Sequence, residues 1–156
     1  MKTRELQQLW WDWLSTSERL LRSLYEQTAA LTLRDVARVE RIQPEIDQMM
    51  SKLRELDNQA VALAHKLAGE LGTEPSLRSL ASVLEKAESQ SLQGLGNRVT
   101  VAARNVQDVL KKNRKLIENE MLYINGSLTL IAKAAVQAKG PFSSAKADSV
   151  LVDQAA

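Results

Sequence analysis

Cysteine is absent from this 156-residue chain, and histidine occurs once, as His65. The missing thiols exclude a disulfide framework, a thiol nucleophile and a thiolate metal site. No second histidine stands at metal-ligand spacing from His65, so we expect it at the surface or boundary of a helix. The carboxylates are scattered among basic side chains, as on a solvated helix. The sequence therefore predicts a protein that is not an enzyme and has no catalytic residues, metal or cofactor.

Long apolar runs and a large excess of one charge are also missing. No window approaches the roughly 18 apolar residues of a membrane span. The 21 basic and 19 acidic residues give a net charge of +2, too small to indicate a nucleic-acid or membrane surface. The first residues lack the apolar run of a signal peptide, so we expect a cytoplasmic protein.

The dense basic run is Lys111–Lys115, which Asn113 interrupts. A patch for nucleic acid or an acidic partner is one interpretation. Asp108, Glu118 and Glu120 flank the run within one or two helical turns and compensate most of its charge. A solvated helix face is therefore the favoured interpretation.

Aromatic residues number only six, so Leu, Ala, Val and Ile must build the core. Their spacing of 3 and 4 is typical of helices packed side by side. The sequence predicts an all-α protein, an elongated antiparallel helical bundle or coiled coil with long helices. Its first helix runs from about residue 3 to 30, with one apolar face formed by Leu6, Trp10, Trp13, Leu20, Leu24 and Leu31.

A second helix is predicted from an N-cap at Thr32, with apolar residues at helical spacing from Val36 to Leu67. Pro44 lies inside this run. Either the helix kinks there, or a short helix ends near residue 41 and another begins with Pro44 in its first turn. The acidic Glu45 and Asp47 suit a helix start and slightly favour the second alternative.

Gly72 is the expected C-terminal cap of this helix and the clearest interior boundary. The stretch Thr73–Ser76 restarts the chain with capping residues and a first-turn proline. A short third helix follows from Leu77 to about Ala87.

The last long helix contains Gly94 and Gly96, which weaken a helix by about 1 kcal/mol each. Its start is therefore expected nearer Asn97, and its end near Ala138. We expect residues 1–139 to form a single helical bundle domain and residues 140–156 to form a flexible tail.

An apolar stripe runs along this last helix, and Asn113 stands on it. A buried amide must find a partner, so we expect Asn113 to set the register of the bundle. From Met121 to Val136 the helix is apolar on more than one face. It is either sandwiched between two helices or keeps an apolar strip for another protein's helix, and the apolar tail favours the second. The stripe residues are Val99, Ala103, Val106, Leu110, Ile117, Ile124, Leu128 and Ile131.

The last long helix carries the stretch Asn113–Glu118, with Met121–Ile124 and Leu128 after it and Asn105 before it. In this stretch, and in its order of long helices, a short middle helix and a long last helix, the chain resembles the FlgN-type flagellar export chaperones over nearly its whole length. Near the end, Lys139–Phe142 stands where family members often have a Tyr-Gly-Pro-like turn, and Val152–Ala155 where they have a final small acidic-alanine motif.

The resemblance implies a cytoplasmic binding protein that holds unfolded hook–filament junction proteins and delivers them to the flagellar type III export apparatus. We expect it to cover their C-terminal helical segments before assembly. The expected partner-binding residues are Ile117, Tyr123, Ile124, Leu128 and Ile131 on the helix and Phe142, Val150, Leu151 and Val152 in the tail.

A structural homodimeric coiled-coil adaptor is the alternative. Its apolar strip would be covered by self-association, and removal of residues 140–156 would change little. The chaperone hypothesis predicts loss of partner binding on the same truncation. A remote third alternative, a nucleic-acid-binding regulator acting through Lys111–Lys115, predicts steep salt dependence of binding.

Overall fold

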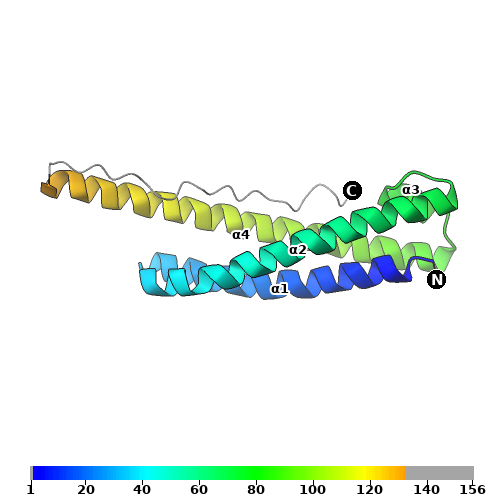
Figure 1. Ribbon diagram of the computed structural model, residues 1–156, viewed down its shortest axis with the longest axis horizontal. Helices are drawn as coiled ribbons and strands as arrows, with labels where there is room; N and C mark the ends of the chain where they lie inside the picture. The colour runs from blue at the N-terminus through cyan, green and yellow to red at the C-terminus, as the bar shows by residue number, and fades with distance from the viewer. Residues whose placement is uncertain (1, 133–156) are drawn as a thin grey trace.

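A computed structural model of the chain describes the backbone of residues 2–132 and the side chains of residues 2–122. This part is built from helices, with no strand among the described residues (Figure 1). The all-α, elongated bundle predicted from the sequence is confirmed. The helices are α1 (Arg4–Thr32), α2 (Val36–Leu71), α3 (Leu77–Ser82) and α4 (Lys86–Ala132).

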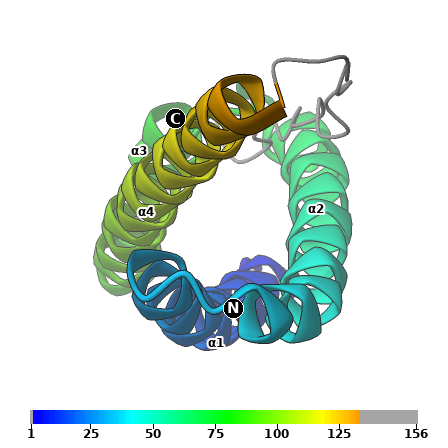
Figure 2. The same cartoon turned by 90° about the vertical axis from the view of Figure 1, so that its left-hand side faces the viewer.

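Helix α1 is the central element. Helices α2 and α4 each pack along it, α3 packs on α4, and α2 and α4 contact each other far less. Figure 2 shows α2 and α4 on the two sides of α1. Helix α2 runs antiparallel to α1, whereas α4 runs parallel to it (Figure 1).

Two apolar clusters hold the bundle together. The larger one combines Leu20 and Leu24 of α1 with Ile46 of α2 and Val106 of α4. The smaller one lies toward the N-terminus of α1, where Leu6 joins residues of α2, α3 and α4. The apolar face predicted for the first helix supplies the residues that α1 contributes to these clusters, because Leu6, Trp13, Leu20 and Leu24 are all buried.

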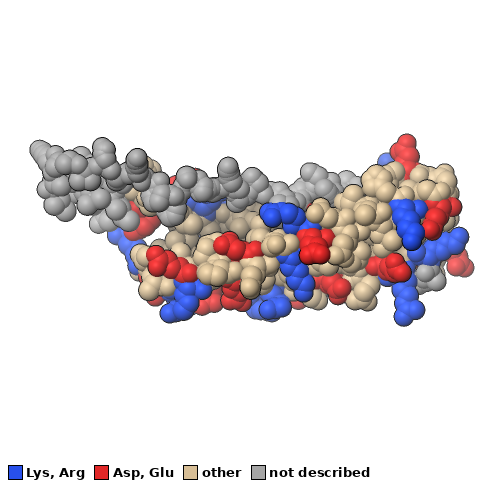
Figure 3. Space-filling view, viewed as in Figure 1, with Lys and Arg blue, Asp and Glu red and all other residues tan. Residues whose placement is uncertain are grey.

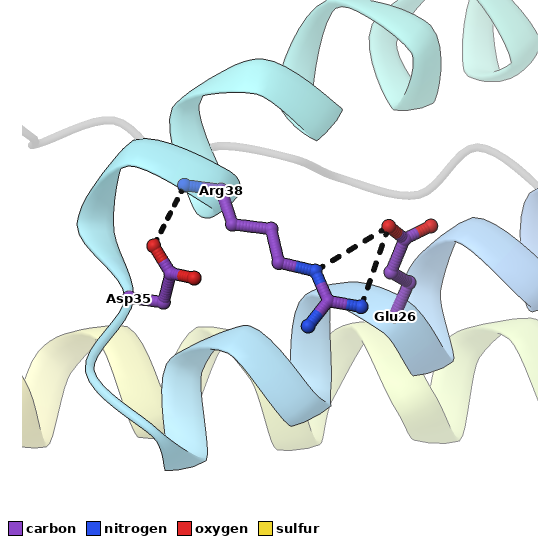
Figure 4. Close-up of polar contacts among 3 residues, drawn as sticks. All are labelled: Glu26, Asp35 and Arg38. Carbon is purple, nitrogen blue, oxygen red and sulfur yellow. Dashed lines mark hydrogen bonds and ion pairs between the residues drawn. The ribbon is translucent and has the colours of Figure 1, made fainter.

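The turn between α1 and α2 differs from the prediction. Thr32 is the last residue of α1, and the N-cap of α2 is Asp35, whose carboxylate accepts a hydrogen bond from the Arg38 N–H at 3.2 Å. Arg34 has φ +56°, a left-handed conformation that lets Arg34 and Asp35 donate to carbonyls of α1. Arg38 also reaches back to Glu26 of α1, with 3.4 Å between Nε and Oε1 (Figure 4).

Pro44 does not interrupt α2, so the slightly favoured helix start at this residue is wrong. The helix is continuous from Val36 to Leu71. Pro44 leaves the Glu40 carbonyl without an intrahelical donor, but both residues are exposed, so water can replace that hydrogen bond. Ile42 and Ile46 on either side are buried in the core and fix the helix on α1.

The boundary after α2 is formed by Gly72, the C-cap residue, with φ +69°. Ser76 caps α3 by accepting a hydrogen bond from the Ser79 N–H at 3.1 Å. Pro75 therefore precedes the cap, so the prediction of a proline in the first helical turn is wrong. Helix α3 ends at Ser82, shorter than predicted, because α4 already begins at Lys86.

Helix α4 runs through both of its early glycines, so the predicted start near Asn97 is wrong. A Cβ atom on Gly96 would lie 2.6 Å from Leu77 Cδ2 and 3.3 Å from Trp10 Cζ3, whereas one on Gly94 would meet nothing. Gly96 thus allows α1 and α3 to approach α4 closely. Tertiary packing outweighs the low helix propensity of the two glycines.

Candidate partner-binding site

Helix α4 is longer than the helical hairpin formed by α1 and α2. Arg34 in the α1–α2 turn pairs with Glu120, with 3.2 Å between Nε and Oε2. Beyond this contact α4 continues to Ala132, past the ends of α1 and α2 (Figure 1). We call residues 121–132 the α4 extension. At 1.5 Å per residue it adds about 18 Å, or roughly three helical turns.

The part of α4 before the extension packs on α1 through one side, which we call the α1-facing stripe. Its members recur at helical spacing and are buried. Ile117, a predicted partner-binding residue, is half-buried near its end. The stripe consists of Leu92, Leu95, Val99, Val106, Val109 and Asn113.

Asn113 holds α4 to α1 through three hydrogen bonds. Its side-chain Nδ2 donates to the Leu24 carbonyl at 2.9 Å and to Gln27 Oε1 at 3.1 Å, and its Oδ1 accepts from Thr28 Oγ1 at 2.5 Å. Gln27 Nε2 in turn donates to Gln43 Oε1 of α2 at 2.7 Å. This polar layer links all three long helices. No buried polar side-chain atom of the described residues lacks a partner.

The helical period shows where the α1-facing stripe leads. Ile124 and Ile131 follow Asn113 by 11 and 18 residues, which is about 20° and 0° around the helix from Asn113 at 100° per residue. Leu122 follows Asn113 by nine residues, on the opposite side of α4, and is 70% exposed. The stripe thus continues in register into the α4 extension.

Most of the predicted partner-binding residues fall beyond the described side chains. Tyr123, Ile124, Leu128 and Ile131 belong to the helical backbone of α4, but their side chains are outside the described part. The predicted tail residues lie outside the described residues altogether: Phe142, Val150, Leu151 and Val152.

The α1–α2 turn presents two apolar side chains that sequence reasoning missed. Leu33 is 71% exposed and Val36 is 59% exposed. Val36 was expected on the apolar stripe of the second helix, but it is the first residue of α2 and lies outside the core. The nearby Asp35 was the available signal for a helix boundary here, because aspartate is a favoured N-cap residue.

The opposite end of the bundle is closed by a buried carboxylate. Glu88 near the start of α4 accepts hydrogen bonds from Thr3 N at 2.7 Å and Thr3 Oγ1 at 2.6 Å, at the N-terminus of α1. Burial by itself raises the pKa of Glu88. The hydrogen bonds from the Thr3 side chain and backbone, the positive charge of the N-terminal amino group and a backbone hydrogen bond from Lys2 outweigh it, so the pKa lies below its usual value.

The charged side chains form no patch of one sign on the face that Figure 3 shows, where basic and acidic groups alternate. Lys111, Lys112 and Lys115 are exposed, as a solvated helix face requires. His65 is exposed on α2, and no group of three potential ligands among the described residues could hold a metal ion. Within residues 2–132 no helix has the length and apolar character of a bilayer span.

Comparison with known protein families identifies the family of this chain. The model of the family described as FlgN protein matches residues 1–140. The chain belongs to the FlgN family. Searches of curated proteins and of solved structures find no match.

Membership of the FlgN family assigns the chain a general role as a flagellar export chaperone. It is a family of chaperones and not of enzymes. The partner of such a chaperone is another flagellar protein. The resemblance seen in the sequence is therefore confirmed at the level of the family.

Proposed function

We propose that this FlgN-family chain binds hook–filament junction proteins in the cytoplasm, shields their C-terminal helical segments from premature assembly, and delivers them to the flagellar type III export apparatus. The family membership supports the general role. The α4 extension supports this mode of binding.

The observation that carries the proposal is that α4 extends beyond the ends of α1 and α2. The turn after α1 meets α4 at Glu120, and the helix then continues to Ala132. An amphipathic helix binds by laying its apolar face on a groove or stripe of matching spacing. The extension offers such a stripe over about three turns.

The proposed contacts combine the helix with the segment that follows it. Ile117 stands where coverage by α1 ends, half-buried. The next positions on the helix are Tyr123, Ile124, Leu128 and Ile131. Residues 140–156, which we propose to be a flexible tail outside the bundle domain of residues 1–139, add Phe142, Val150, Leu151 and Val152.

Co-purification tests the proposal. The full chain is mixed with a junction protein that carries its C-terminal helix and, separately, with the same protein lacking it. We expect recovery of the first and loss of the second. Equal recovery of both would rule out docking through the terminal helix.

A truncated chain that ends at residue 139 tests the tail in the same assay. We expect weaker partner binding with the same thermal unfolding midpoint, because the tail is proposed to lie outside the bundle domain. A stable homodimer that binds no junction protein with or without the tail would support the structural adaptor instead.

A further inference from the structure

We propose that the bound helix prolongs α1. It lies along the α4 extension, end to end with α1 on the α1-facing stripe, and its near end packs against Leu33 and Val36 of the α1–α2 turn. This inference rests on the proposed function, because the occupant it names is the amphipathic terminal helix of the exported partner.

The first step is that α1 ends while the α1-facing stripe of α4 continues beyond it. Asn113 bonds to Leu24 and Gln27 near the end of α1. Glu120 pairs with Arg34 and stands seven residues, about two turns, after Asn113 on the same side of α4. After Thr32 the chain turns away into α2.

The second step is the match in length and spacing. The extension covers about three turns, and the positions in register with Asn113 are Ile124 and Ile131. These are the positions that a prolonged α1 would cover. A partner helix of three to four turns with apolar residues at 3 and 4 spacing therefore continues an interface that the chain already uses within itself.

The third step concerns the end of the bound helix. A helix seated on the extension beside the end of α1 reaches the α1–α2 turn. There Leu33 is 71% exposed and Val36 59% exposed. Both are large apolar side chains without a role in the core of the bundle, and contact with the bound helix would remove them from water.

The experiment measures the affinity of the full-length chain for a purified hook–filament junction protein. The test variants are Leu33→Gln and Val36→Gln. Val61→Gln is the matched control on α2, because Val61 is also exposed. Leu122→Gln is the control on α4, because Leu122 lies on the side opposite to Asn113. We expect each turn variant to weaken binding about tenfold, and each control by less than about twofold.

A second measurement uses the absence of cysteine from the chain. A photo-crosslinker attached to Leu33→Cys should mark the C-terminal helix of the junction protein, whereas one attached to Val61→Cys should not. Leu33 is exposed, so these variants should fold like the wild type, and thermal unfolding verifies it.

The outcomes separate the two ideas. If the wild-type chain binds no junction protein, the proposed function and this inference both fail. If it binds, but the turn variants bind as tightly as the controls and Leu33→Cys gives no crosslink, the proposed function stands and this inference is overturned. It is also overturned if the turn variants dissociate a homodimer, because a second copy would then occupy the stripe.

Discussion

The two ends of the bundle are built from different kinds of contact. At the closed end, Glu88 binds the N-terminus of α1 through a buried carboxylate, and Leu6 and Leu80 pack beside it. At the open end, an ion pair between partly exposed Arg34 and Glu120 joins α4 to the turn, and Leu33 and Leu122 remain in water. The outermost contacts at the open end are thus a partly exposed ion pair and apolar side chains outside the two core clusters, so a partner can bind there without disturbing those clusters.

Asn113 is the strongest test of this comparison, because it is the last fully buried support of α4 before the open end. Asn113→Ala removes three hydrogen bonds and leaves the Gln27 and Thr28 side chains without that partner. We expect the free energy of unfolding to fall by about 2–3 kcal/mol in urea denaturation.

Asn105→Ala is the control, since Asn105 is an exposed asparagine on the same helix. It should change stability by less than about 0.5 kcal/mol. Equal effects of the two substitutions would show that the polar layer does not hold α4 in place.

The closed end should respond to acid through Glu88. Its lowered pKa means that the carboxylate stabilises the fold fully above the ordinary pKa of about 4.5, and that this contribution is lost as the pH falls toward the lowered value. We expect Glu88→Gln to cost about 1–2 kcal/mol at pH 7. The difference from wild type should shrink as the pH falls below 4.5.

Urea unfolding at several pH values measures this difference. Glu74→Gln serves as the control, because Glu74 is exposed in the loop between α2 and α3. A gap between wild type and Glu88→Gln that does not narrow in acid would mean that the ionised carboxylate is not what closes this end.

At the open end, the stability of the α1–α2 turn should depend on which residue replaces Arg34. The left-handed conformation of this residue is unfavourable for any side chain with a Cβ atom, by about 1 kcal/mol, and glycine relieves it. We therefore expect Arg34→Gly to be about 1 kcal/mol more stable than Arg34→Ala, although both lose the pair with Glu120. Thermal unfolding of the two variants measures this difference in stability. An alanine variant as stable as the glycine variant would contradict the left-handed conformation of residue 34.

The smallest effect is expected from the glycines at the closed end. Gly94→Ala should stabilise α4 by up to about 1 kcal/mol, because helix propensity rises and the site is open. Gly96→Ala should gain less or lose stability, because the new methyl group forces the Leu77 side chain to move. An equal rise in the unfolding midpoint of both variants would show that α3 does not pack closely on α4.

The sequence predicted the helices and their buried faces well, because both depend on apolar spacing that is read along one helix at a time. Leu6, Leu20 and Leu24 are buried as expected. Helix ends were harder to predict. Local propensity made Thr32 and Asn97 reasonable helix starts, but α1 ends at Thr32, α2 begins only at Val36, and α4 begins well before Asn97, at Lys86.

The candidate site was predicted in part for a related reason. The apolar stripe after Asn113 is visible in the sequence, but where α1 stops covering it depends on the α1–α2 turn, which only the assembled fold places beside Glu120. The exposed Leu33 likewise looks like any core leucine until its surroundings are known. The hydrogen bond between Gln27 and Gln43 links two helices and has no local signature.

The central position of α1 has a consequence for the order in which the protein folds. Three residues separate α1 from α2, whereas Thr3, the N-cap residue of α1, contacts Glu88 of α4 across 85 residues. Closing the short loop loses less chain entropy, so we expect the α1–α2 hairpin to form early and α4 to attach last. In native-state hydrogen exchange, the amides of α4 should then open together, before those of the hairpin.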